Sequence, residues 1–181
     1  MTDDPERGAA EPSTAATPGP EEAWERTVAD MEAMADSRRE RDGWAAVSVA
    51  AERLVLDPPE GDLSDPFGLV FDVDPERADP VADAFERCTF PRYEVYRNEL
   101  GGTVFLVTEL LDPGSELALL LAGRYRIEEL DPVVRSARAR EELFTHLRTT
   151  DGHSLGTVRH DGYEKFVPEG FTPDLDEERL L

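Results

Sequence analysis

The chain has 181 residues, a length that suits one domain of ordinary size with tails. Its 41 acidic residues outnumber its 19 basic residues and give a formal net charge of -22 at pH 7, which disfavours binding to nucleic acid and to anionic membranes. A single cysteine, Cys88, excludes an intrachain disulfide.

The basic residues are almost all arginine: 18 of the 19 are arginine and one is lysine, Lys165. Scarcity of lysine, with acidic residues spread along the whole chain, resembles the proteins of archaea that keep molar salt in the cytosol. At 1 M salt the Debye length is about 3 Å, so the self-repulsion of such a chain is screened. The resemblance implies a halophilic, archaeal protein.

Residues 1–19 combine Pro, Ala, Thr, Ser and acid with almost no large apolar side chain, which predicts a disordered acidic N-terminal tail. This stretch has neither the basic start nor the apolar run of a signal peptide. The longest apolar run of the chain, Leu117 to Ala122, falls far short of the roughly 18 residues that span a bilayer. We therefore expect a cytoplasmic protein with no membrane partner.

An amphipathic helix is predicted over residues 20–42. Pro20 suits its first position, and the basic residues before Gly43 suit its last turn, as the helix dipole favours. Its apolar residues recur at helical spacing on one narrow stripe: Trp24, Val28, Met31 and Ala35. The stripe should dock on the rest of the chain.

Short strands are predicted over 45–49 and 53–56, and a buried strand over 67–73. Asp79 and Pro80 then suit the N-cap and first position of a second helix. Cys88 falls on the apolar stripe of that helix, which favours a structural thiol over a nucleophile.

From Pro91 onward the pattern indicates strands over 92–100, 103–111 and 115–123, joined by Gly- and Pro-containing turns. Two consecutive turns of this kind imply a three-stranded meander. The last two strands are apolar almost without alternation, which indicates cover on both faces. The Leu and Ala content of 115–122 also suits a helix, but its short length and flanking glycines favour a strand.

A third helix is predicted to open at Asp131 and Pro132, followed by a hairpin over 143–160. The elements together define an α+β fold: a mostly antiparallel sheet with the meander and the terminal β-hairpin, and about three helices packed on it. We expect a single domain over 20–167 and an acidic C-terminal tail over 168–181.

All three histidines lie near that hairpin. A two-residue turn at Asp151 and Gly152 would pair His146 with Thr157 and leave His160 facing the other way. A three-residue loop would instead bring His146 and His160 to about 7 Å, close enough to share a metal or an anion. The two-residue turn is preferred, and zinc-type spacing is absent, so neither a metal nor a cofactor is predicted.

Residues 124–160 are the least acidic part of the chain, with seven arginines against six acidic residues. An anionic group would find its most favourable environment here. The opposing interpretation is that these arginines pair with the protein's own acids. The candidate ligand-binding residues are Arg135, Arg138, Arg148, Arg159, His146 and His160.

The leading functional hypothesis is a non-enzymatic module that binds a protein partner or a small anionic ligand through residues 124–160. The alternative is a small enzyme that uses His146 or His160 for acid-base or metal chemistry. Phosphate-binding loops, nucleophile elbows and dinucleotide fingerprints are missing, so no catalytic residue is assigned.

Four stretches, "FGLVF", "FPRYEVYRNEL", "VFLVTELLDP" and "THLRTTDGHSLGTVRHDGYEKFVP", lie between Trp44 and Pro168. Over this range the chain resembles a small haloarchaeal protein family of unknown function. The resemblance implies habitat and a self-contained domain, and it carries over no activity and no site residues.

Overall fold

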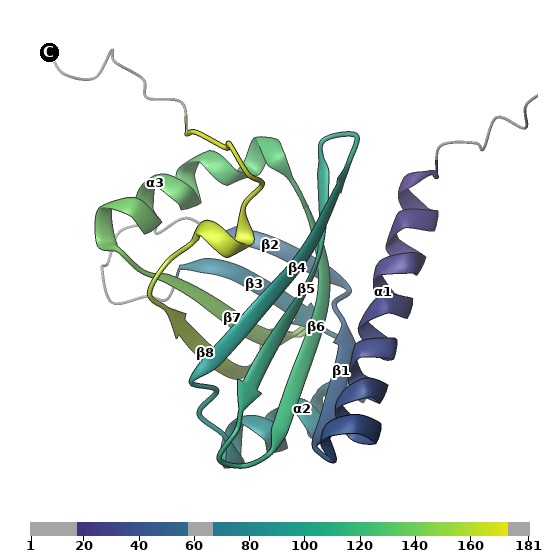
Figure 1. Cartoon of the computed structure of the whole chain (residues 1–181). Coiled ribbons are helices and arrows are strands. Elements are labelled where there is room, and N and C mark those ends of the chain that lie inside the picture. The colour runs from purple at the N-terminus through teal and green to yellow at the C-terminus, as the bar shows by residue number, and fades with distance from the viewer. Residues whose placement is uncertain (1–17, 58–66, 174–181) are drawn as a thin grey trace, which may run out of the picture.

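A computed structural model of the chain describes residues 18–57 and 67–173 (Figure 1). Within these residues, eight strands form two four-stranded sheets, with three α-helices packed against them. The α+β class and the mostly antiparallel pairing are confirmed. Most of the predicted tails, 1–17 and 174–181, lies outside the described residues.

The first sheet, here called the meander sheet, has the strand order β1-β6-β5-β4. β4, β5 and β6 are antiparallel neighbours, as the predicted meander requires, and β1 joins β6 in parallel. Residues 117–122 are therefore strand and not helix. The strands are β1 (Ala45–Ala50), β4 (Arg92–Leu100), β5 (Thr103–Asp112) and β6 (Leu117–Arg126).

The second sheet, the hairpin sheet, has the order β2-β3-β7-β8. Only its central pair, β3 and β7, is parallel. Its strands are β2 (Arg53–Asp57), β3 (Gly68–Val73), β7 (Leu143–Thr149) and β8 (Ser154–His160).

The structure has two sheets, whereas the sequence predicted one. The chain changes from one sheet to the other between β1 and β2. The Ala51 N–H donates to the Ala122 carbonyl of the meander sheet, whereas the Glu52 N–H donates to the Asp72 carbonyl of the hairpin sheet. The chain thus passes from one sheet to the other within two residues. This corner lets the apolar faces of both sheets enclose one core, which a single flat sheet could not do.

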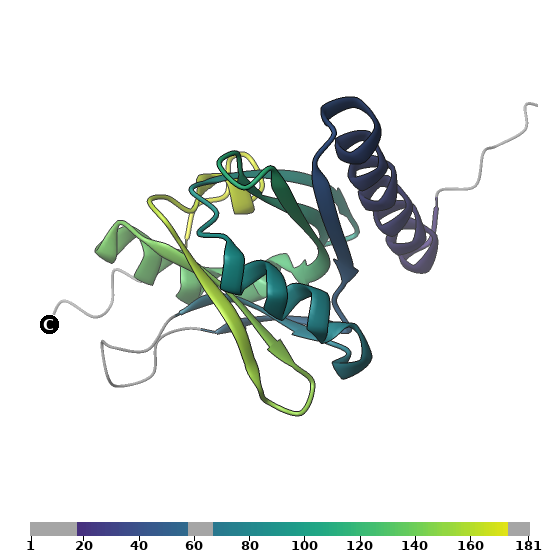
Figure 2. The same ribbon diagram turned by 90° about the horizontal axis from the view of Figure 1, so that it is seen from below.

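Two short helices close the ends of that core. α2 (Ala78–Arg87) lies across the lower end, as the view from below shows (Figure 2), and α3 (Leu130–Arg140) covers the opposite end. Both insert apolar side chains between the sheets. On β8, Gly156 leaves room for Phe85 of α2, because a Cβ there would lie 2.3 Å from the phenylalanine ring.

Both of these helices begin earlier than predicted. A 3-10 turn, Pro75–Arg77, runs directly into α2, so the capping carboxylate is Asp74, which accepts from the Glu76 N–H, and not Asp79. A second 3-10 turn, Ile127–Glu129, leads into α3 at Leu130. The Asp-Pro steps therefore lie inside the first helical turns. Cys88 is buried beyond the end of α2, in keeping with a structural thiol.

α1 (Pro20–Ser37) packs outside the two-sheet core, on the outward face of the meander sheet (Figure 1). It continues into a π-helical turn, Arg38–Asp42, and ends at Gly43, whose φ of +68° suits glycine. The predicted stripe of the helix is confirmed, since all four of its residues join a second apolar cluster with β5 and β6.

Candidate functional site

The terminal hairpin sets the positions of the histidines. His146 pairs with Thr157 and Phe144 with Arg159, as a two-residue turn predicts. Nearer the turn the register shifts, because Arg148 pairs with Ser154 and the Thr149 N–H donates to the His153 carbonyl.

The predicted turn is therefore wrong in detail. The loop spans three residues, 150–152, and a bulge at Leu155 restores the predicted register farther along the strands. Polar contacts of Thr149 hold the longer loop: its hydroxyl donates to Asp151 and accepts from the His153 N–H. A side-chain network of this kind cannot be foreseen from the Asp-Gly step alone.

His160 lies on the inward face of the hairpin sheet and is 1% exposed. Its Nε2 is 2.8 Å from Thr145 Oγ1, while its Nδ1 has no hydrogen-bond partner among the described residues. Its ring lies against Tyr93 and Phe166, at centroid distances of 4.2 and 4.9 Å. Burial lowers the pKa of His160 to about 4, so the imidazole is neutral at pH 7.

His146 lies on the outward face, with Nδ1 2.5 Å from Thr157 Oγ1. Partial burial, and then the charge of Arg148, lower its pKa. The two histidines thus point to opposite sides of the sheet and share no site. In the part of the chain that the structure describes, no group of three or more His, Cys, Asp or Glu side chains could hold a metal ion.

Three of the four candidate arginines are neutralised by carboxylates. Arg135 Nε lies 2.8 Å from Asp131, Arg148 Nε 2.6 Å from Asp72, and Arg159 Nε 2.7 Å from Glu142. Arg159 also reaches Asp161 at 2.9 Å, and Arg138 is exposed on α3. The candidate residues therefore divide between α3 and the two faces of the hairpin, with an acidic partner already bound to most of the cations.

Asp72 shows why one of these arginines is occupied. The carboxylate is 3% exposed, and it accepts from Arg148 on one side and Arg53 on the other. Burial alone would raise its pKa, but the two arginines outweigh that effect and keep the pKa below its usual value. Arg148 is thus needed to neutralise a buried acid.

A different feature offers space for a ligand: a groove of about 530 Å³ between α1 and strands β4 and β5. We call it the α1–β4 groove. Ala33 and Met34 of α1 supply accessible apolar surface, and Phe105 and Val107 of β5 lie beneath it, 1% and 3% exposed. Tyr96 of β4 also lines it and is 50% exposed. The other large apolar side chains among the described residues are less exposed than Tyr96. The volume lies within the range of ligand pockets.

The groove exists because one helix covers only part of the sheet. α1 packs on β1, β6 and β5, and leaves the outward face of β4 open. Strands lie about 4.8 Å apart and a helix is about 10 Å wide, so a single helix cannot cover all four strands. The fourth strand of the sheet keeps its face accessible.

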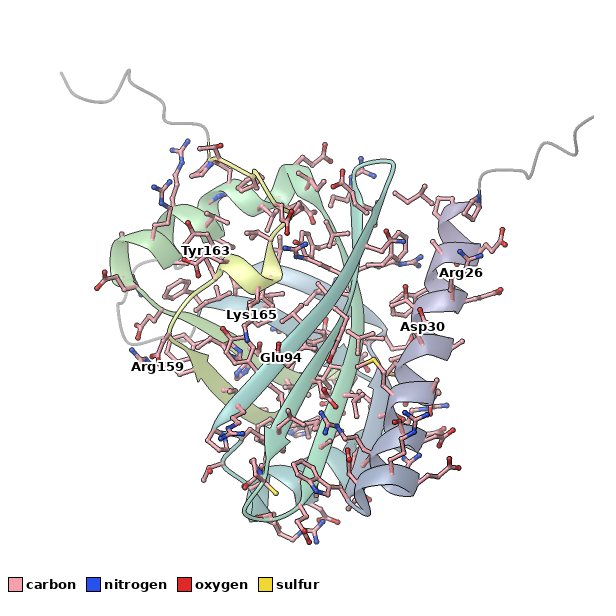
Figure 3. The ribbon with its side chains drawn as sticks, viewed as in Figure 1. Arg26, Asp30, Glu94, Arg159, Tyr163 and Lys165 are labelled. Carbon is pink, nitrogen blue, oxygen red and sulfur yellow. The ribbon has the colours of Figure 1, made fainter. Side chains whose placement is uncertain are left out.

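Most charged side chains in or near the groove already have a partner within the protein. Arg97 Nε donates to the Lys165 carbonyl at 3.1 Å, and nearby Arg38 holds Glu109 at 2.7 Å. Asp30 is exposed on α1, close to Arg26 (Figure 3), and its carboxylate makes no ion pair with another described residue. Lys165 and Glu94 pair at 3.4 Å at the free edge of β4, and Glu94 lies on the same face of that strand as Tyr96.

The sequence interpretation missed Tyr96, Asp30 and Met34, although signals for them were present. β4 alternates between exposed and covered positions, whereas β5 and most of β6 are buried on both faces. A narrow helical stripe cannot cover all four strands of a sheet. Combining these observations would have predicted a partly uncovered sheet face beside the helix.

The fold and the groove define an α+β protein with an open, partly apolar groove beside α1. Among the residues that the structure describes, no helix is long and apolar enough to cross a membrane. The chain belongs to a family of unknown function, DUF7529, whose model matches residues 10–168. Searches of curated proteins and of solved structures gave no significant match.

Proposed function

We propose that this protein is a non-enzymatic module that binds a segment of a protein partner in the α1–β4 groove. The observation that carries the proposal is the apolar groove itself, with the half-exposed ring of Tyr96 at its side. Exposed aromatic side chains beside an apolar cleft are typical of the residues that dominate protein interfaces.

The other binding hypothesis, a small anion held by the arginines of 124–160, has less support. Arg135, Arg148 and Arg159 would each have to release a carboxylate before binding a ligand. The alternative of a small enzyme would have to use His146 or His160 singly, because the two lie on opposite faces of the hairpin sheet.

We also propose that the protein works in the cytoplasm of a halophilic archaeon. The net charge of -22 and the single lysine support this habitat. Exposed carboxylates repel one another in dilute buffer, and molar salt screens that repulsion within about 3 Å.

A display library of random peptides, selected against the folded protein, tests the binding function. We expect enriched peptides to lose at least tenfold in affinity on Tyr96→Ala, because an anchoring ring is removed. Ala33→Arg should block the groove, while Ala29→Arg, one turn earlier on the exposed side of α1, is the matched control. Peptides that bind all three variants equally would refute the groove as the site.

A further inference from the structure

The shape and charge of the α1–β4 groove also indicate what kind of segment it takes. We infer that the occupant is an amphipathic helix that lies beside α1 and carries a lysine or arginine opposite Asp30. This inference rests on the proposed function and adds the secondary structure and the charge of the partner.

The width of the sheet argues for a helix. The four strands of the meander sheet span about 14 Å between their outer axes, at about 4.8 Å per strand. α1 lies over β1, β6 and β5, so a second helix packed about 8–10 Å from α1 would lie over the uncovered edge strand β4. A helix placed there would pack against both α1 and the sheet.

The apolar surface of the groove suits the stripe of such a helix. The accessible apolar side chains of the groove are Ala33 and Met34 of α1 and the half-exposed Tyr96 of β4, while Phe105 and Val107 of β5 form a floor beneath them that is 1% and 3% exposed. These side chains come from three neighbouring elements. A helix that presents apolar residues at i, i+3, i+4 and i+7 can contact them along its length.

The charge of the groove selects a basic partner. The arginines near it are engaged: Arg97 with the Lys165 carbonyl, Arg38 with Glu109 and Asp42, and Arg26, one turn before Asp30, with Glu22 at 3.8 Å. Asp30 is left with an exposed carboxylate beside the apolar surface. In a chain of net charge -22, this arrangement attracts a cation and repels an acidic segment.

A second copy of the chain is a poorer occupant. Each copy carries a net charge of -22, and an acidic surface would have to approach Asp30. The predicted N-terminal tail, residues 1–19, has almost no large apolar side chain with which to fill the groove. Both remain outcomes of the test.

The experiment is a selection from a display library of helix-forming peptides, at the lowest KCl concentration at which the protein remains folded. We expect the enriched peptides to share an apolar i, i+3, i+4, i+7 pattern and at least one basic residue, and to become helical on binding. Asp30→Asn should weaken them by about fivefold, the upper range for an exposed ion pair. A selection against Asp30→Lys should enrich acidic residues at the same position.

The matched control is Glu25→Gln, another exposed acid of α1 that does not line the groove and makes no ion pair with another described residue. Enriched peptides that depend on Tyr96 but show no basic preference, or no helical pattern, would overturn this inference and leave the proposed function standing. Failure to enrich any peptide that depends on Tyr96 would overturn both. A dimer in solution that Tyr96→Ala dissociates would assign the groove to a second copy and would also overturn the inference.

Discussion

The outward faces of the two sheets differ in how many arginines neutralise a buried carboxylate. On the meander sheet, Glu109 lies 1% exposed near the end of α1 and depends on one arginine, Arg38, which donates two hydrogen bonds to it. On the hairpin sheet, Asp72 lies between Arg53 and Arg148 in one row across three strands. One acid has a single cationic neighbour and the other has two.

This difference separates the two candidate surfaces. The hairpin sheet gathers arginines, but they neutralise the protein's own acids and are not available to a ligand. On the outward face of the meander sheet, Arg124 and Arg126 are likewise paired, with Glu21 and Glu128, but the uncovered strand β4 leaves a partly apolar groove open beside them. In an acidic chain, therefore, arginines mark internal neutralisation, and the uncovered groove is the better candidate for binding.

The largest effect should come from removing the single cationic neighbour. Arg38→Ala leaves the buried carboxylate of Glu109 without compensation, which should lower the free energy of unfolding by about 4 kcal/mol, as measured by chemical denaturation. The hydrogen bonds to Glu109 also raise the pKa of Arg38, so the cation is always present in the native protein.

The matched change on the other sheet is Arg148→Ala. Asp72 then keeps Arg53, so we expect a loss of only about 1 kcal/mol. Equal losses for Arg38→Ala and Arg148→Ala would show that the number of arginine neighbours does not matter, and would break the comparison.

The two faces of the hairpin sheet should also differ in their response to acid. His160 has a folded-state pKa of about 4 against an ordinary value of 6.5, so the unfolded chain takes up the proton first. Stability is therefore fully present above pH 6.5 and is lost as the pH falls toward 4. Between pH 7 and pH 4.5 this histidine should cost about 2.5 kcal/mol, measured by denaturation at each pH.

His160→Phe keeps an aromatic ring against Tyr93 and Phe166 and removes the titration, so it should flatten the profile over this window. His146→Gln, on the outward face, should change the profile less, because that ring is only partly buried. An unchanged acid profile in His160→Phe would assign the acid sensitivity to other groups.

Salt should act on the acidic surface rather than on the core. Raising KCl from dilute buffer to molar concentration should stabilise the protein by about 2 kcal/mol, or roughly 6 °C in melting temperature, because screening removes repulsion among exposed carboxylates. Sorbitol at matched osmolality is the control for nonionic solute effects. A melting temperature that is indifferent to salt would contradict the proposed halophilic habitat.

Much of the fold could be predicted from periodicity. The spacing of apolar residues along the chain was enough to predict three features: the meander strands, the buried strand β3 and the apolar stripe of α1. The division into two sheets could not be predicted, because it depends on backbone hydrogen bonds at Ala51 and Glu52 to strands distant in sequence.

The candidate site was predicted less well, for the same reason. Arginine content identified a region, but its use is decided by carboxylates that pairing brings from elsewhere, such as Asp72 beside Arg148, 76 positions away along the chain. The register that separates His146 from His160 was predicted correctly beyond the bulge at Leu155. The groove required knowing which strands α1 covers, and that is a tertiary property.

The smallest effect should come from the N-terminus, where α1 begins. Deleting residues 1–17 should change the free energy of unfolding by less than about 0.5 kcal/mol, because this stretch has little apolar surface to bury. Extending the deletion to 1–19 should cost measurably more, since the Gly19 carbonyl accepts the Ala23 N–H at 3.0 Å in the first turn of α1. If deleting 1–17 lost several kcal/mol instead, the tail would be contributing to the packed structure, and the α1–β4 groove would be the first surface on which to look for it.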